Sequence, residues 1–489
     1  APFKAIERTL PKPSIMASVN HMSTKSRHEY ELTGTISKFL DLHLIFPLLD
    51  FVEMNNLYDS KGVSQARLEL LKPTKMVDYA MEIHQTLHGD NIPKSMIENR
   101  GKVFKKLNEL KEAAATLRSI IEDPETARKL MEQNHFTWGA IKAENNLPDN
   151  SLEAYADLAK FNYDCGDYKG AEVALNNYLI ITGGPNATSR GPSCLWGKLA
   201  CAILNLNSDL AMQLIKEVKQ MIDFDVSSTL EQLQQRSWLM HWSLFVFFNH
   251  SSGRDELISL FFEEKFLQAI QTNSPWLLRY LVAAVILTRG NSAGKKDQIM
   301  HDLLRTLEEE QSSYTDPITK FLEYLFVHFD FDGAMTQRME CEQVLRDDFF
   351  LCSVCSEFME AARLLTFETY CRIHRKIDIG LLAQKMGMDS DDAEKWIADL
   401  IRNSKLNARI DTRENSVVMG TAVPSVYQQV IDKTDDLNMR SYVLVNQLKH
   451  LSNESGNFTN DDESYDNVKR HQLRRNVRGP GNRQDRYRD

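Results

Sequence analysis

The sequence contains no hydrophobic run long enough to cross a membrane. The nearest candidate is WSLFVFF (242–248), whereas a membrane-spanning helix needs about 20 apolar residues. The first thirty residues carry scattered charge and lack the sustained apolar core of a signal peptide, so we expect none there. These absences exclude a membrane-embedded protein, and we expect no membrane partner.

Motifs of catalysis and cofactor binding are also missing. We find no HExxH, GxxxxGK[ST], GxSxG or GxGxxG pattern. The one CxxC, Cys352 to Cys355, has no second pair and no histidines at zinc spacing. His241, His250 and His374 stand beside aromatic residues, without a nucleophile or a cluster of carboxylates. The sequence therefore predicts a protein that binds, with no enzymatic activity, no cofactor and no metal.

Cysteine usage and net charge narrow the class further. Seven cysteines, mostly at apolar helical positions, indicate reduced thiols and a location in the cytoplasm or, in part, the nucleus. The net charge of −10 and the pI near 5.8 argue against a surface that grips nucleic acid over its whole extent. Leu, Ala, Glu, Lys and Met are plentiful and alternating Val and Ile runs are scarce, which favours a mostly α-helical chain.

What the chain does contain is a recurring pattern of apolar helix, short polar turn and second helix. Three copies align on Ala171, Ala211 and Ala334, with matching residues twelve and eight positions before each alanine and seven positions after it. These offsets mark one face of a helix on each side of the turn. The matching residues are Ala159, Leu199 and Leu322, then Tyr163, Ile203 and Phe326, and after the turn Tyr178, Val218 and Cys341.

Turn-forming clusters recur about every forty residues over almost half of the chain. This period is typical of stacked helical hairpins of the tetratricopeptide or HEAT kind, in which each unit buries its apolar face against its neighbours. An ordinary helical protein with coincidental loop lengths is the alternative. The turns are expected at Gly166-Asp167, Asn207-Ser208, 249–255, 289–297 and Asp332-Gly333.

A different pattern occupies 358–421. A long helix is followed by a short strand (377–379), a short helix (381–386) and a third helix that Asp389 caps. Two strands joined by a turn at 413–416 end the region. Three helices followed by a β-hairpin form a winged helix, and the hairpin leaves an edge strand with unpaired backbone groups. The expected buried face of the third helix is Ala393, Trp396, Ile397, Leu400 and Ile401.

Winged helices often read DNA through the third helix, but the charges here disfavour that use. Four carboxylates occupy its N-terminal turns, where they would repel a phosphate backbone. They are Asp389, Asp391, Asp392 and Glu394, and the bases Arg402, Lys405 and Arg409 lie toward the far end. We therefore expect the winged helix to contact protein, with DNA recognition as the alternative.

A helical solenoid followed by a winged helix resembles the PCI-domain family, found in the proteasome lid, the signalosome and eukaryotic translation initiation factor three. Particular stretches narrow the resemblance to the e-subunit family of that factor, over about 29–450. They include EYELTGTISKFLDLHLIFPLLDFVE (29–53), EDPETARKLM (122–131), LWGKLA (195–200), QQRSWLMHWSLFVFFNHSSGRDELISLF (234–261), DPITKFLEYLFVHFDFDGA (316–334), RIHRKIDIGLLAQKMGMDSDDAEKWIADLIRN (372–403) and SVVMG (416–420).

The resemblance implies a PCI architecture and a non-catalytic scaffold subunit of initiation factor three. Such a subunit binds the small ribosomal subunit and supports pre-initiation complex assembly and mRNA recruitment. A scaffold subunit of the proteasome lid or signalosome is the first alternative, and a winged-helix DNA-binding regulator is the second. In the family, winged helices associate side by side and C-terminal helices gather in a bundle, which implies contacts with other subunits of the factor.

The residues expected to meet those partners lie in the wing and in a helix predicted over about 425–450. The wing residues are Ile410, Val417, Val418 and Met419. The helix carries an apolar stripe, Tyr427, Val430, Ile431, Leu437, Leu444, Val445 and Leu448. Because this stripe follows a finished domain, we expect it to bind another chain; folding back onto the solenoid is the alternative.

The expected organisation has five parts. They are an N-terminal extension (1–28), a helical repeat region (29–245), a PCI domain (246–421, winged helix from 358), an interaction helix (422–451) and a tail (452–489). The extension and the tail are expected to be disordered. Basic residues dominate the tail end, which could contact RNA weakly; a solvated tail is the alternative. The arginines expected to do so are Arg474, Arg475, Arg478, Arg483 and Arg486.

Overall fold

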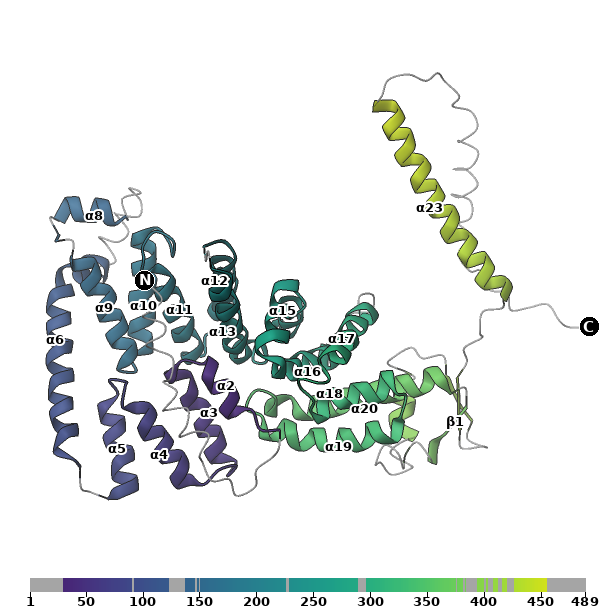
Figure 1. Ribbon diagram of the computed structural model, residues 1–489, viewed down its shortest axis with the longest axis horizontal. Helices are drawn as coiled ribbons and strands as arrows, with labels where there is room; N and C mark the ends of the chain where they lie inside the picture. Colours follow the sequence, from purple (N-terminus) through teal and green to yellow (C-terminus); the bar gives the residue numbers. More distant parts are fainter. Residues whose placement is uncertain are drawn as a thin grey trace, which may run out of the picture.

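The computed structural model is a curved stack of helices that ends in a small sheet and a single projecting helix (Figure 1). It describes residues 30–89, 92–122, 137–145, 147–148, 150–225, 228–288, 296–374, 376–380, 383, 394–399, 402, 408–411, 416–419 and 426–454. The expected extension at 1–28, the tail arginines, the loop at 289–295 and most of the winged helix's second and third helices lie outside these residues.

The predicted all-α solenoid followed by a winged helix is confirmed. The first elements are α2 (Thr33–Ile36), η2 (Ser37–Phe39), α3 (Leu42–Met54), α4 (Ser60–Leu71), α5 (Val77–His88), α6 (Lys94–Glu122) and α8 (Trp138–Asn145). The stack continues with α9 (Asn150–Asp164), α10 (Tyr168–Thr182), α11 (Gly191–Leu204), α12 (Ser208–Asp225), α13 (Thr229–Phe247), α14 (Gly253–Phe261), α15 (Glu264–Asn273), η3 (Pro275–Leu277) and α16 (Leu278–Thr288). It ends with α17 (Lys296–Glu310), α18 (Pro317–Leu322), η4 (Glu323–Val327), α19 (Phe331–Asp347), η5 (Cys352–Val354) and α20 (Cys355–Ile373).

One hydrophobic core holds the stack together. It runs without interruption from Ile36 to Leu365 and so crosses residues 245 and 246, where the sequence analysis places a domain boundary. A second, small core from Phe367 to Val417 belongs to the winged helix. Among the described residues, no helix is both long and apolar enough to cross a membrane.

The three aligned alanines lie where the helices of a hairpin cross. Ala171, Ala211 and Ala334 are all fully buried, which confirms that a small side chain allows the helices to pack closely there. The positions twelve residues earlier and seven residues later are buried in every copy as well. The spacing in the sequence therefore reflects real structural repeats.

The hairpins also share one turn geometry. Five residues before each alanine the backbone is left-handed, with φ of 91° at Gly166, 58° at Leu206 and 52° at Phe329. The side chain of the next residue then accepts a hydrogen bond from a backbone N–H in the first turn of the second helix. These capping residues are Asp167, Asn207 and Asp330.

The turn expected at Asp332-Gly333 is displaced by three residues. Helix α19 begins at Phe331, and the Asp330 side chain accepts a hydrogen bond from the Gly333 N–H at 3.1 Å, so Gly333 lies inside the helix. The reversal stands at Phe329 and Asp330, five and four residues before Ala334 as in the other two hairpins, so Asp332 and Gly333 belong to the first turn of α19. The preceding helix ends in the π-helical turn η4, and the Asp330 N–H donates to the Tyr324 carbonyl, six positions back.

Residues 30–54, which we call the N-terminal strap, contact helices from distant parts of the stack and do not form another repeat. At its α3 end, the Tyr163 hydroxyl donates to Asp41 at 2.5 Å, and the His43 ring hydrogen-bonds the Tyr168 hydroxyl at 3.0 Å. Burial, together with the Asp41 carboxylate, raises the pKa of Tyr163, which keeps its hydroxyl protonated as a donor. The strap is thus fixed to α9 and α10.

The middle of the strap meets α13 and η3. The Phe39 ring stacks on His241, with centroids 4.4 Å apart, and the Trp242 indole N–H donates to the Phe39 carbonyl at 3.1 Å. His241 itself is fully buried. Its Nδ1–H donates to the Ser237 carbonyl at 2.6 Å, and its Nε2 accepts from the Trp276 indole at 3.0 Å. Burial lowers the pKa of His241 to about 4, so the ring is neutral.

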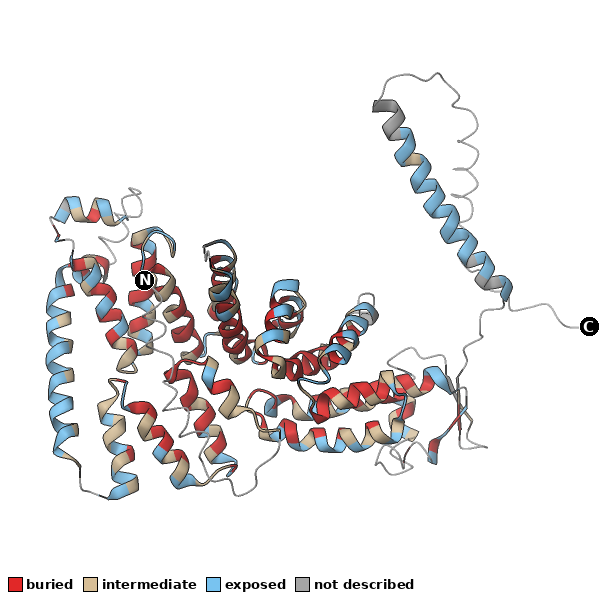
Figure 2. Cartoon of the chain, in the orientation of Figure 1, coloured by how far each residue is buried: buried red, intermediate tan, exposed pale blue. Residues whose placement is uncertain are grey.

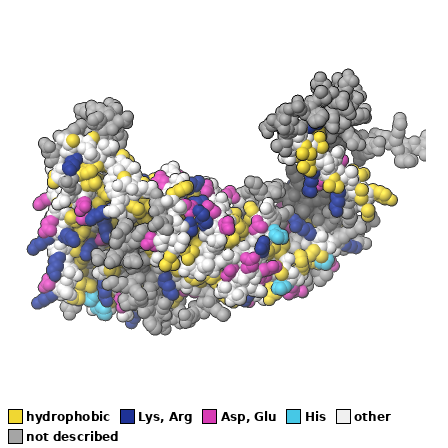
Figure 3. Space-filling model, turned by 45° about the horizontal axis from the view of Figure 1, so that its top comes forward, with side chains coloured by type: hydrophobic (Ala, Val, Ile, Leu, Met, Phe, Trp, Pro, Cys, Tyr) yellow, Lys and Arg dark blue, Asp and Glu magenta, His cyan; other side chains and the backbone are white. Residues whose placement is uncertain are grey.

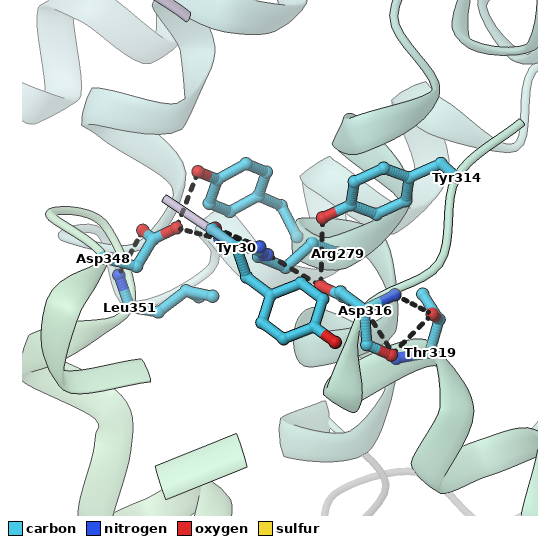
Figure 4. A network of polar contacts seen from close by, with 8 residues as sticks. Tyr30, Arg279, Tyr314, Asp316, Thr319, Asp348 and Leu351 are labelled. Atoms are coloured by element: carbon cyan, nitrogen blue, oxygen red, sulfur yellow. Dashed lines mark hydrogen bonds and ion pairs between the residues drawn. The ribbon is translucent and has the colours of Figure 1, made fainter. Parts of the chain in front are cut away.

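The start of the strap binds a buried arginine (Figure 4). Arg279 on α16 donates to Asp316 at 2.7 Å, to Asp348 at 3.1 Å and to the backbone carbonyl of Tyr30 at 2.7 Å. The Tyr280 hydroxyl also donates to Asp348, at 2.8 Å. Since a buried charge is tolerated only when it is paired and hydrogen-bonded, this cluster fixes the strap, α16, α18 and the loop after α19 relative to one another.

Replacing Leu206 with glycine should stabilise the protein. Its side chain is 84% exposed, so little packing is lost, while a left-handed non-glycine residue costs roughly 1–2 kcal/mol. After the greater backbone entropy of glycine in the unfolded chain is subtracted, we expect a gain of up to about 1 kcal/mol in the free energy of unfolding. Urea denaturation of Leu206→Gly checks this. Gly166→Leu at the equivalent position should destabilise, and a less stable Leu206→Gly would contradict the shared turn.

Acidification should weaken the fold through His241. Because its folded pKa of about 4 lies below the unfolded value of about 6.5, the neutral ring stabilises fully above pH 6.5. This contribution is lost as the pH falls from 6.5 toward 4. His241→Gln cannot titrate, so between pH 7 and 5 it should lose about 2 kcal/mol less stability than wild type, measured by urea denaturation. Equal losses in the two proteins would show that the ring is not held neutral.

Candidate protein-interaction surface

The winged helix contains one antiparallel sheet. Its strands are β1 (Lys376–Asp378), β2 (Ala408–Asp411) and β3 (Ser416–Met419), in the order β1-β3-β2. Val417 on the central strand lies opposite Ile377 of β1 and Ile410 of β2. The predicted hairpin, made of β2 and β3, therefore forms. Because β3 is the central strand, β2 and β1 are the two edges of the sheet. A strand from a partner could pair only with β1 or β2.

Val417 lies in the core and not on a surface. Its side chain is fully buried with Ile377, Ile397 and Phe367, so the assignment of Val417 to a partner interface is corrected. The alternation of a strand explains this, because neighbouring side chains point to opposite faces and Val418 is the more exposed of the two. Ile410 is half-buried against the same core. The side chain of Met419 lies outside the described residues.

The described part of the third helix packs through two neighbouring residues. Ile397 is fully buried, whereas Trp396, which the sequence analysis placed on the buried face, is only half-buried. The Trp396 ring meets Phe367 of α20 edge-on, with centroids 5.6 Å apart. Arg402 lies 3.7 Å from Asp399 within the same helix, both side chains being exposed. The carboxylates Asp389, Asp391 and Asp392 and the base Lys405 lie outside the described residues.

Helix α23 (Val426–Glu454) confirms the predicted C-terminal helix and carries the largest exposed apolar surface of the described chain. Figure 2 shows it projecting from the sheet end and exposed over almost its whole described length. Leu444 and Leu448, for example, are 58% and 61% exposed. All the predicted stripe residues are exposed: Tyr427, Val430, Ile431, Leu437, Leu444, Val445 and Leu448. The stripe therefore does not fold back onto the described solenoid.

Five of the stripe residues, together with Thr434 and Ser441, have the spacing of a coiled-coil seam. These positions alternate between three and four residues apart along α23, as the a and d positions of a heptad do. The seam positions are Tyr427, Val430, Thr434, Leu437, Ser441, Leu444 and Leu448. A seam this long suits another helix lying along it. The sequence analysis identified the face but not this regular repeat.

The histidines and cysteines singled out in the sequence have structural surroundings. His250 lies 3.0 Å from Asp209 at a hairpin turn, and the His374 ring packs against Tyr370. Cys352 and Cys355 are free thiols. Within the described ranges, no three His, Cys, Asp or Glu side chains come together in a way that could hold a metal ion.

Three family models match the chain in sequence order. The model described as the eIF3 subunit 6 N terminal domain matches residues 31–162, and the PCI domain model matches residues 337–421. The third model describes the C-terminal region of the E subunit of eukaryotic translation initiation factor 3. It matches residues 425–445, which lie within α23 apart from the first of them. The projecting helix is therefore a recognised part of that family.

Curated relatives agree over most of the chain. The E subunit of eukaryotic translation initiation factor 3 from Arabidopsis thaliana is 40% identical over 437 residues, covering 87% of this chain and 97% of the relative. The proteins of the same name from Aedes aegypti and Aspergillus clavatus are 40% and 39% identical, over 85% of this chain and 94% and 93% of their own lengths. With this identity and coverage, the chain belongs to the E-subunit family of eukaryotic translation initiation factor 3.

Proposed function

We propose that this chain is a non-catalytic scaffold subunit of initiation factor three, which binds the small ribosomal subunit and supports pre-initiation complex assembly and mRNA recruitment. It joins other subunits of the factor through its winged helix and α23. A protein with this role acts where translation starts, which is the cytoplasm. Family membership supports the general role, and the exposed surfaces of the C-terminal region support the mode of assembly.

The exposed seam of α23 carries this proposal. Leaving a run of leucine, valine and isoleucine side chains in water forgoes about 25 cal/mol per Å² of apolar surface, which a partner helix would recover. Soluble proteins rarely keep such a patch unless it binds something. The heptad spacing favours one or more helices as the partner, and a bundle built from the C-terminal helices of several subunits would satisfy it.

The edges of the winged-helix sheet offer the second contact. The backbone groups of β1 and β2 that do not face β3 can pair with a strand from a neighbouring winged helix. Ile410 lies on the edge strand β2, whereas Val418 and Val417 lie on the central strand β3 and Val417 is buried in the interior. In an arc of winged helices paired edge to edge, the α23 helices would all lie on the same side, where they could form a bundle.

The alternative functions have less support. The named relatives are translation factor subunits, which favours initiation factor three over the proteasome lid and the signalosome. Recognition of DNA by the winged helix has no supporting observation in the described part of the third helix, where the bases Lys395 and Arg402 are balanced by Glu394 and Asp399. The tail arginines lie outside the described residues. Their contact with ribosomal or messenger RNA is part of this proposal.

Charging the seam should remove the protein from the complex without unfolding it. Leu444→Glu with Leu448→Glu places two carboxylates where a partner helix would pack, and burying unpaired charges is costly. Expressed with an affinity tag in eukaryotic cells, this variant should recover at least about tenfold less of the other initiation factor subunits than wild type. Quantitative mass spectrometry of the purified complexes, including small-subunit ribosomal proteins, makes the measurement.

The opposite face of α23 supplies a matched control. Met439 and Val443 have the same spacing and are 67% and 49% exposed, but they lie about half a turn away from the seam. Met439→Glu with Val443→Glu should therefore keep the other subunits. If the two double variants lose the other subunits to the same extent, the seam is not the binding face. If neither variant loses them, α23 is not an assembly helix. Co-purification with proteasome lid or signalosome subunits would support the first alternative function.

A further inference from the structure

Four lysines from three segments of the chain surround the C-terminal end of α9. We call Lys75, Lys106, Lys111 and Lys160 the α9-end lysine cluster. Lys160 is one turn before Asp164 on α9, and the backbone N–H of Lys75, in the turn after α4, donates to the Asp164 carbonyl at 3.0 Å. The other two lie on α6, which packs along α9.

The electrostatics of the α9 end show that the four lysines act on the same spot. Burial raises the pKa of the Asp164 carboxyl to about 6, and Lys160, Lys75 and Lys106 each act to lower it. Burial likewise raises the pKa of Cys165 to about 11, against the effect of Lys75 and Lys111. Lys160, Lys75 and Lys106 therefore act on the Asp164 carboxyl, Lys75 and Lys111 act on the neighbouring Cys165, and Asp41 and Asp167 are further carboxylates nearby.

These lysines have no ion-pair partner among the residues that the structure describes. Two lysines of α12, by contrast, pair with neighbouring acids: Lys216 with Glu256 at 2.7 Å, and Lys219 with Glu263 at 2.5 Å. An unpaired group of like charges destabilises the surface that carries it, and a bound polyanion relieves that repulsion. The chain as a whole has a net charge of −10, so the cluster is unusual within it.

The adjoining half of α6 extends the positive surface. Between residues 94 and 106 it carries five basic residues and one acid, Glu98. Phe104 lies among them, 48% exposed, with the Arg100 guanidinium 5.5 Å from its ring centroid. Figure 3 shows basic side chains, with acidic ones between them, at the end of the molecule that α6 forms.

We propose that the α9-end lysine cluster and the N-terminal half of α6 form an RNA-binding surface, at the opposite end of the molecule from α23 (Figure 1). The lysines contact backbone phosphates, and Phe104 offers a ring on which an unpaired base stacks. The exposed aromatic ring favours RNA over an acidic polypeptide, which has no bases to stack. This inference rests on the proposed function, because the ribosome is the RNA that a protein with that function meets.

The test reverses three of the four charges in the full-length chain. Lys106→Glu, Lys111→Glu and Lys160→Glu together should raise the Kd for a fluorescein-labelled RNA hairpin with single-stranded arms by at least about tenfold at low salt. Each lost phosphate contact lowers the slope of log K against log salt by about 0.7–0.9, so the slope should fall by about 2. Fluorescence anisotropy over a salt series measures both quantities.

A second, matched triple variant separates the effect of the site on RNA binding from the effect of net charge. Lys38, Lys61 and Lys433 are exposed lysines elsewhere on the chain that form no ion pair with a described residue, so reversing them changes the net charge equally. That variant should leave the salt slope unchanged. Equal effects of the two triple variants, or an unchanged slope in the cluster variant, overturn the proposal. A third result would also overturn the proposal: polyglutamate displaces the RNA from wild type but not from the cluster variant. The site would then prefer an acidic polypeptide.

Sedimentation with small ribosomal subunits distinguishes this inference from the function on which it rests. If wild type sediments and the cluster variant still binds the hairpin with an unchanged slope, the surface is wrong and the function stands. If the cluster variant loses the hairpin but wild type does not sediment, the surface stands and the ribosomal role fails. Phe104→Ala should weaken hairpin binding without changing the salt slope, since stacking involves no phosphate.

Discussion

Arg279 sets a constraint on which the arrangement of the solenoid depends. A guanidinium 1% exposed must have its donors satisfied inside the protein, and its acceptors come from Tyr30, Asp316 and Asp348. Breaking one partner from a buried charge pair costs about 3–5 kcal/mol, because the remaining charge cannot reach water. The positions of the N-terminal strap, α16, the start of α18 and the loop after α19 relative to one another are therefore constrained by the arginine, in addition to contacts between successive hairpins.

This arrangement changes how the repeats should be understood. In an ordinary solenoid each unit contacts only its neighbours, so stability is approximately a sum of local terms. Here the N-terminal strap contacts α9, α13, α16 and the loop after α19, and it makes distant repeats depend on one another. The apolar residues that stabilise the fold lie in this shared core, while those of α23 lie outside it. The apolar surface that stabilises the fold and the apolar surface that stays exposed are therefore carried by different parts of the chain.

The sequence predicted the features whose signal is local. Helical hairpins follow from apolar spacing, and Gly166 was the obvious left-handed position in its turn. Leu206 and Phe329 share that conformation, but nothing in their residue type indicates it. The turn before α19 lies three residues before the Asp-Gly pair that suggested it, because Asp332 and Gly333 are in the first turn of that helix. Period-two alternation could have shown that Val417 and Val418 face opposite sides, and heptad counting could have identified the seam.

The strap could not be predicted, because its partners lie far away along the chain: Tyr30 and Arg279 are 249 residues apart. That separation has a consequence for synthesis. The ribosome delivers the strap first and Asp348 last, so the nascent strap must wait while about 320 residues are added, at roughly 5–20 residues per second. Its contacts with α9, α10 and α13 can form earlier, but the packing of its first residues is completed only when the loop after α19 has been made.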